Sequence, residues 1–207
     1  MKRTGLSLPA RSSLNWAGAD DNTSGVAAML EIAQYLAAER SKGGLRSRRD
    51  LIVAAWSGEE LGLFGSKAFV EDFYELYPNA KRPEKKASKN DEVDAAHSHG
   101  ASSDEVALTE AVAAYLNLDM VGRLREKLVI QGIGSSPGFE GEVQRRNLPV
   151  GLPLQLDKAS SRLPTDTSAF VGRQVPILSA FTGAHEDYHT PRDTADKLNY
   201  EGAAKIE

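Results

Sequence analysis

Apolar residues recur along the chain with two different spacings, and these spacings predict alternating helices and strands. Between Thr23 and Arg40 they follow one face of a helix, with Thr23 or Ser24 available to cap the first turn. Leu51–Trp56 is a short continuous apolar run, the pattern of a strand covered on both faces. Further helices are predicted over Leu61–Leu76, Pro137–Asn147 and Thr165–Gly172, and further strands over Val112–Leu118, Leu128–Ile133, Leu152–Asp157 and Val175–Phe181. The first of these strands could instead continue a helix begun at Ser103.

Strands that alternate with helices predict an α/β fold with a largely parallel sheet. A length of 207 residues suits one domain, which we place over residues 1–207. Residues 77–103 interrupt the alternation with a charged, Ala- and Ser-rich stretch that includes KRPEKKASKNDE. We expect this stretch to be a surface insertion with the composition of a disordered segment.

Composition narrows the range of functions. The formal net charge of −4 argues against a nucleic-acid partner, and the absence of cysteine excludes disulfides, thiolate metal ligands and cysteine nucleophiles. No apolar run approaches the ~18 residues that a membrane-spanning helix needs. The basic first residues are not followed by an apolar segment, so no signal peptide is visible.

Acidic residues and a histidine follow predicted strands or begin a predicted helix. Glu59 and Glu60 follow the strand that ends at Trp56, Asp119 follows the next one, and His189 follows the last. Asp21 lies where the first helix starts. Because ligands in such sheets gather outside the carboxyl ends of the strands, we expect these side chains to converge on one pocket.

Carboxylates and imidazoles together are the ligands of catalytic zinc, and the adjacent Glu59 and Glu60 suit a division between general base and metal ligand. Taken singly, each residue has a plainer interpretation. Asp21 could belong to a turn and helix cap, the glutamates could complement a helix dipole, and His189 could be an exposed loop residue. Of the other histidines, His97 and His99 lie in the polar insertion and are predicted to be solvated, and His185 is predicted to lie near the site or to be exposed.

The combined pattern resembles the M28 family of zinc aminopeptidases. The matching segments are GADDNTSGVAAMLEIA, RDLIVAAWSGEELGLFGSKAFV, AYLNLDMVGRL and PTDTSAFVGRQVPILSAFTGAHEDYHTPRDTADKLNYEGAAKI, in the family's order. The resemblance implies a three-layer α/β fold with a mostly parallel, mixed, twisted sheet and helices on both faces, as in zinc exopeptidases. It also implies hydrolysis of the peptide bond beside a free N-terminus, with a peptide as the substrate.

The resemblance also implies roles for individual residues. Asp21 would bridge two zinc ions, Glu60 and His189 would bind one of them, and Asp119 would bind the other. Glu59 would be the general base, and Tyr188 would hydrogen-bond the developing oxyanion, although on its own it could be an ordinary half-buried tyrosine. Glu59 and Asp119 would also suit recognition of the substrate's α-ammonium group.

One departure from the family pattern changes the expected metal content. Family members carry a His-x-Asp motif upstream of the segment matching GADDN, and no histidine precedes Asp21 here. We therefore expect an internal part of a longer catalytic domain, truncated at both ends, which binds one zinc tightly and a second poorly. Such a chain could itself be inactive. Export is expected of the full-length parent, and the oligomeric state is left open.

Two other relatives of the same fold provide alternatives. A glutaminyl-cyclase-like aminoacyltransferase would need a single zinc and would use the Asp, Glu and His positions present here. A receptor-like relative would keep the fold without a metal site. The presence of Asp21, Glu59, Glu60, Asp119 and His189 argues against the receptor-like alternative.

Overall fold

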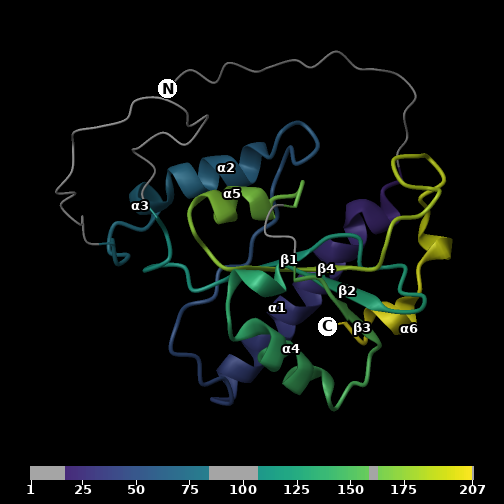
Figure 1. The fold of residues 1–207 in the computed structure, drawn as a ribbon, viewed down its shortest axis with the longest axis horizontal. Helices are drawn as coiled ribbons and strands as arrows, with labels where there is room; N and C mark the ends of the chain where they lie inside the picture. The colour runs from purple at the N-terminus through teal and green to yellow at the C-terminus, as the bar shows by residue number, and fades with distance from the viewer. Residues whose placement is uncertain (1–16, 84–106, 159–162, 207) are drawn as a thin grey trace.

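The sheet is mixed, with both parallel and antiparallel pairs of strands. The computed structural model describes residues 17–83, 107–158 and 163–206. Within them the strand order is β1, β4, β2, β3 (Figure 1), with β1 parallel to β4, β2 parallel to β3, and β4 antiparallel to β2. The strands are β1 (Tyr115–Leu118), β2 (Leu128–Gln131), β3 (Leu154–Leu156) and β4 (Ile177–Phe181). Since β1 and β4 run in the same direction, the segments that follow them leave the sheet at the same edge.

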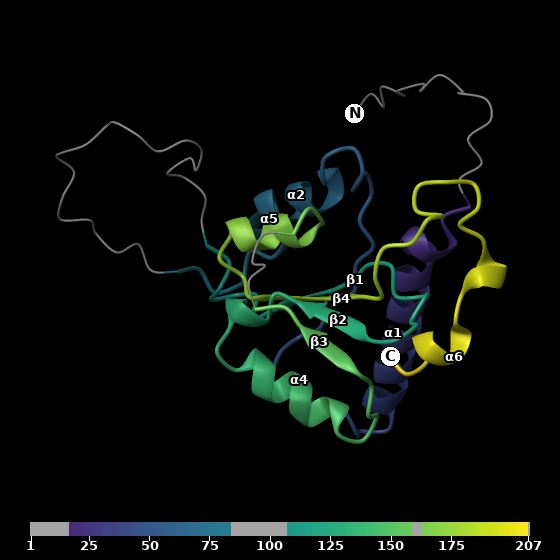
Figure 2. The ribbon, with the colours of Figure 1, turned by 45° about the vertical axis from the view of Figure 1, so that its right-hand side comes forward.

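Helices cover both faces of this sheet. In Figure 1, α2 (Phe64–Glu71), α3 (Phe73–Leu76) and α5 (Thr167–Gly172) lie above it, and α1 (Gly25–Ser41) and α4 (Phe139–Asn147) lie below. Figure 2, turned by 45°, keeps α2 and α5 on one side and α4 on the other. The shorter helices are η1 (Ala19–Ser24), η2 (Ile133–Ser135), η3 (Ala195–Lys197) and α6 (Tyr200–Ala203). The predicted three-layer α/β fold is confirmed.

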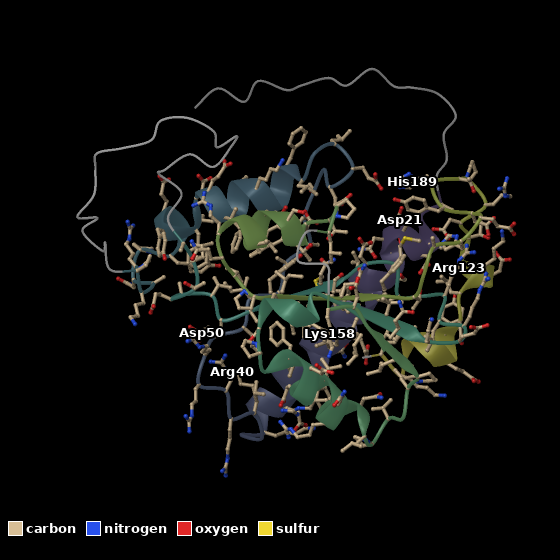
Figure 3. All side chains as sticks on the ribbon, in the orientation of Figure 1. Asp21, Arg40, Asp50, Arg123, Lys158 and His189 are labelled. Carbon is tan, nitrogen blue, oxygen red and sulfur yellow. The ribbon has the colours of Figure 1, made fainter. Side chains whose placement is uncertain are left out.

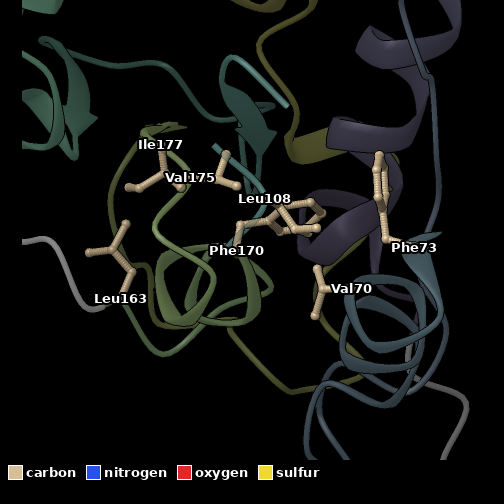
Figure 4. Packing of buried hydrophobic residues seen from close by; sticks show 7 residues of the cluster. All are labelled: Val70, Phe73, Leu108, Leu163, Phe170, Val175 and Ile177. Carbon is tan, nitrogen blue, oxygen red and sulfur yellow. The ribbon is translucent and has the colours of Figure 1, made fainter. Parts of the chain in front are cut away.

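Alternation along β4 supplies two apolar clusters. Ile177 packs with α2, α3 and α5, whereas the next residue, Leu178, packs in the second cluster with α4. This is the two-residue period of a strand whose two faces are both covered. The first cluster contains Val70, Phe73, Leu108, Leu163, Phe170, Val175 and Ile177 (Figure 4), and the second contains Leu124, Leu128, Ile130 and Ile133.

The predicted strand over Leu51–Trp56 is wrong. The segment forms no strand in the described part of the chain, and Leu51, Ile52 and Val53 are 56%, 50% and 49% exposed. The apolar run indicates a preference for burial, but a strand also needs a neighbouring strand to pair with. None of the described strands pairs with Leu51–Trp56. The predicted helix over Leu61–Leu76 exists but begins at Phe64 and is interrupted at Asp72.

Of the other predicted elements, the first helix begins at Gly25 and extends one residue past its predicted end, to Ser41, and the rest occur within their predicted ranges, most of them shortened by a few residues. Most of the predicted insertion over residues 77–103, namely residues 84–103, lies outside the described residues. Among the helices of the described residues, none is long and apolar enough to cross a membrane.

Candidate metal centre

Asn22 joins the start of α1 to the end of β1. Its Oδ1 accepts hydrogen bonds from the backbone N–H of Gly25 at 3.1 Å and of Met120 at 3.2 Å. Its Nδ2 donates to the carbonyl of Leu118 at 3.0 Å. These bonds bring the residues on either side, Asp21 and Asp119, toward each other. Asn22 therefore connects two segments that are about a hundred residues apart in sequence.

The predicted cap from Thr23 or Ser24 is wrong. Ser24 precedes α1, but its side chain forms no cap hydrogen bond. Its Oγ instead donates to the backbone carbonyl of Asp20 at 2.8 Å, and Asn22 provides the acceptor for Gly25. The Ser24 hydroxyl also lies 3.0 Å from Oδ1 of the buried Asp20 carboxylate, so bonding to Asp20 replaces capping here.

A tight turn between the Leu51–Trp56 segment and α2 presents the two glutamates. The Glu59 carbonyl accepts hydrogen bonds from the N–H of Gly62 at 3.0 Å and of Leu63 at 2.9 Å. Gly58 and Leu63 both have positive φ angles, 70° and 64°, so the chain reverses sharply around Glu59 and Glu60. The Glu60 side chain is 52% exposed and reaches the histidine loop.

Three predicted metal ligands meet in space. His189 Nε2 lies 2.6 Å from Glu60 Oε1 and 3.1 Å from Asp21 Oδ2. Ligand atoms of all three residues lie within 4.8 Å of one another. Asp21 and His189 appear together in Figure 3, on the side of the molecule away from Arg40 and Asp50.

The donor set fits a zinc ion. Two carboxylates and one imidazole are a ligand combination found in catalytic zinc sites, which hold three protein ligands and keep one position open. With zinc–ligand distances of ~2.0–2.1 Å, tetrahedral ligand atoms lie about 3.3 Å apart. The observed separations of 2.6 and 3.1 Å would have to widen by about 0.7 and 0.2 Å to reach this spacing.

The surrounding charges favour a cation. Burial and then the Glu60 charge raise the pKa of Asp21. Burial, Glu60 and Asp119 raise the pKa of Glu59 to about 7, and burial followed by the Asp21 charge raises that of Asp119 to about 6. Several carboxylates thus share a region where like charges oppose ionisation. A bound cation would relieve that repulsion.

Asp119 lies in the same electrostatic environment but outside the three-residue cluster. The charges of Asp21 and Glu60 act on it, and it lines the same cavity of about 1300 Å³ as Glu59. The cavity walls combine these acids with apolar side chains. Such a combination of an apolar pocket with a few converging polar groups is typical of ligand sites.

Tyr188 precedes the histidine and stacks on it. The two ring centroids are 3.7 Å apart, and 43% of Tyr188 is exposed. Burial, followed by the charges of Glu60 and Asp21, raises the Tyr188 pKa to about 12. The phenol therefore stays protonated at neutral pH and can donate a hydrogen bond.

Sequence reasoning missed several buried polar residues around the cluster. Asp20 is fully buried, and its Oδ2 lies 3.2 Å from Nε2 of His185, whose side chain is 2% exposed. Asp166 is 9% exposed and also lines the cavity. Arg123 is 5% exposed and contacts two aspartates. For Asp20, the signal in the sequence was its position next to Asp21. His97 and His99, which were predicted to be solvated, lie outside the described residues.

Known proteins resemble this chain in both sequence and fold. It is 27% identical to leupeptin-inactivating enzyme 1 of Streptomyces exfoliatus over 87% of the chain and 32% of that protein. It is 48% identical to aminopeptidase NAALADL1 of Rattus norvegicus over 27% of the chain and 8% of that protein. The chain thus spans a third or less of the length of these curated relatives.

Solved structures share the fold at lower identity. A zinc aminopeptidase from Bacillus subtilis aligns with a TM-score of 0.61 and 21% identity, over 91% of this chain and 39% of that one. LapB from Legionella pneumophila gives 0.65 and 18%, over 93% and 45%. The model of peptidase family M28 matches residues 7–207. The chain therefore belongs to peptidase family M28.

Proposed function

We propose that this chain carries the centre of a zinc-dependent aminopeptidase that hydrolyses the peptide bond beside a free N-terminus. The observation that carries the proposal is the meeting of Asp21, Glu60 and His189, with ligand atoms within 4.8 Å of one another. Glu59, adjacent to a ligand and with a pKa of about 7, supplies a base matched to neutral pH.

Each residue has one task in the proposed reaction. Asp21, Glu60 and His189 hold zinc, which when bound supplies a Lewis acid that polarises the scissile carbonyl and acidifies water. The Glu59 carboxylate accepts the proton of the attacking water and delivers it to the leaving amine. The Tyr188 hydroxyl donates a hydrogen bond to the oxygen on which negative charge develops.

The acidic cavity suits a substrate with a free amino terminus. Glu59, Asp119 and Asp166 line it, and burial is the first cause of the raised pKa of each. An α-ammonium group would offset their repulsion and favour their ionised forms. The similarity to proteins named as aminopeptidases also supports cleavage at the amino-terminal end of the substrate.

We further propose that the site has two metal positions with unequal affinity for zinc. Three residues with contacting ligand atoms make a position for one tightly held zinc. A second position would take Asp119 together with the bridging Asp21. With two carboxylates and no imidazole, this second position would bind zinc weakly.

Two glutamine variants test the assignment. Glu59→Gln should lower kcat on an aminoacyl-p-nitroanilide by roughly 10²–10⁴-fold, since an amide cannot accept the proton. Its zinc content should match that of the unaltered protein. Glu60→Gln should lower zinc affinity first, measured by competition with a chelator, and activity should return at high zinc.

The outcomes separate base from ligand. Loss of zinc in Glu59→Gln would reassign Glu59 as a ligand. Equal hydrolysis of peptides with free and acetylated N-termini would contradict the aminopeptidase assignment. Activity that survives complete zinc removal would contradict metal dependence altogether.

A glutaminyl-cyclase-like reaction is the competing proposal, favoured by the fact that the contacting ligands number three and suit one metal. A peptide beginning with glutamine distinguishes the two. Release of free glutamine supports hydrolysis, whereas loss of ammonia with retention of the full peptide supports cyclisation. A receptor-like relative would show neither product.

A further inference from the structure

Arg123 is a buried cation in the loop that follows β1. Its side chain is 5% exposed, and it lies four residues beyond Asp119. The preceding residue, Gly122, donates its backbone N–H to Oδ1 of Asp20 at 2.7 Å. Removing a guanidinium from water is costly unless anions and hydrogen bonds compensate it.

Two aspartates compensate Arg123, one through each terminal nitrogen. Nη1 donates to Oδ2 of Asp187 at 2.9 Å, and Nη2 donates to Oδ1 of Asp193 at 2.6 Å. The aspartate side chains are only 5% and 2% exposed. The planar fork of one arginine thus bridges two separate carboxylates, which the single ammonium of a lysine cannot reproduce.

Asp193 transmits this contact to the backbone of a proposed ligand. Its second oxygen, Oδ2, accepts the backbone N–H of Asp20 at 2.9 Å and of Asp21 at 3.0 Å. The carbonyl of Asp193 also accepts the N–H of Ala19 at 3.0 Å. Asp193 therefore links Arg123 to the backbone of the segment that carries Asp21.

Asp187 transmits the other contact to the histidine loop. Its carbonyl accepts the Thr190 N–H at 3.0 Å and the Thr190 hydroxyl at 2.8 Å, closing a turn around Tyr188 and His189. Within this turn His189 has a φ of 54°, in the left-handed region that few side chains adopt. The turn must therefore be fixed from outside for the imidazole to face Asp21.

We propose that Arg123 is a positioning residue for the metal centre. It contacts none of the three proposed ligands, yet through Asp193 and Asp187 it sets the spacing between the Asp21 segment and the His189 turn. The proposal rests on the proposed zinc function. Groups that hold metal ligands from outside typically change metal affinity by 10–100-fold when they are removed.

The two carboxylates depend on Arg123 to different degrees. Asp187 also contacts Lys197 Nζ at 2.8 Å and Arg192 Nε at 3.1 Å. Asp193 takes its hydrogen bonds from Arg123 and from two backbone N–H groups. Loss of Arg123 should therefore disturb the Asp21 segment more than the histidine turn.

The test uses Arg123→Met and Arg123→Lys, with Arg192→Met as the matched control. Arg192 contacts the same Asp187, but its side chain is 66% exposed. The readouts are zinc affinity by chelator competition, the visible spectrum of the cobalt-substituted protein, and urea unfolding without metal. We expect Arg123→Met to weaken zinc binding 10–100-fold and to alter the cobalt spectrum. Arg123→Lys should recover part of the affinity, and Arg192→Met should leave both readouts unchanged.

Other outcomes overturn the proposal. Wild-type zinc affinity and an unchanged cobalt spectrum in folded Arg123→Met would show a structural role only, even if unfolding becomes easier. If Arg123→Met does not fold, Asp193→Asn takes its place, because it keeps the side-chain shape and removes the charge that Arg123 contacts. Unchanged affinity in that variant also overturns the proposal. Failure of the unaltered protein to bind zinc would overturn the proposed function itself.

Discussion

At the scale of single residues, the acidic cluster opposes its own ionisation. Burial and neighbouring carboxylates raise the pKa of Glu59 to about 7, above its ordinary value of 4.5, and that of Asp119 to about 6, above 3.8. In the interval between the ordinary and the raised pKa, the folded protein binds more protons than the unfolded chain. Stability therefore falls as the pH rises through that interval. Functional sites often carry such a cost in stability.

We accordingly predict that the metal-free protein is less stable at pH 7.5 than at pH 5.5. The melting temperature in the presence of a chelator measures this directly. The interval lies above the range in which Asp187 titrates, since hydrogen bonds from Lys197 and Arg123 lower its pKa. The contacts of Asp187 should therefore contribute equally to stability at these two pH values.

Glu59→Gln is the control for this pH dependence. The amide does not titrate, so the variant should lose part of the difference between the two pH values and melt at a higher temperature at pH 7.5 than the unaltered protein. A metal-free protein that is equally or more stable at pH 7.5 would show that the cluster is not under charge repulsion.

At the scale of elements, an aromatic side chain of α5 packs directly on the sheet. Phe170 is 2% exposed and stacks on Tyr115 of β1, with ring centroids 3.9 Å apart and planes within 6°. It also lies 6.1 Å from the Trp56 ring and 6.2 Å from the Phe69 ring of α2. One side chain thus connects two helices and an edge strand.

Truncation of this side chain should destabilise the upper layer. We predict that Phe170→Ala lowers the free energy of unfolding by about 3–5 kcal/mol, as large-to-small changes in packed cores do. Urea unfolding of the zinc-free protein measures it. The control is Leu148→Ala, at a position 80% exposed, which should stay within about 0.5 kcal/mol of the unaltered protein. Equal effects of the two variants would contradict the packing shown in Figure 4.

The elements also show which information the sequence contains. Four apolar runs became β1 to β4, because each run meets a neighbouring strand in the sheet. Leu51–Trp56 is also an apolar run and forms no strand, because pairing depends on a neighbouring strand that composition does not specify. The link that Asn22 makes to the end of β1 was likewise hidden, since its partners Leu118 and Met120 lie about a hundred residues away in sequence.

At the scale of the whole molecule, the site exists only when distant segments are in register. The convergence of Asp21, Glu60 and His189 was predicted from the rule that ligands gather at strand ends, but only His189 follows a described strand, because the segment before Glu60 forms none. The bridge from Arg123 to Asp187 and Asp193 could not, because it depends on which side chains become buried together after folding. Local patterns thus locate the proposed ligands, and tertiary packing determines which residues hold them.

Since the proposed ligands come from three segments, zinc binding and folding should be coupled. A ligand that binds only the folded state adds about 2.7 kcal/mol to the free energy of unfolding when its concentration is 100 times its dissociation constant. We predict that the first equivalent of zinc raises the melting temperature markedly and that further equivalents raise it little. His189→Gln should abolish the increase, whereas Glu75→Gln, at an exposed position of α3, should retain it. Metal analysis after dialysis should find one zinc per chain, and two tightly held ions would contradict the unequal positions proposed above.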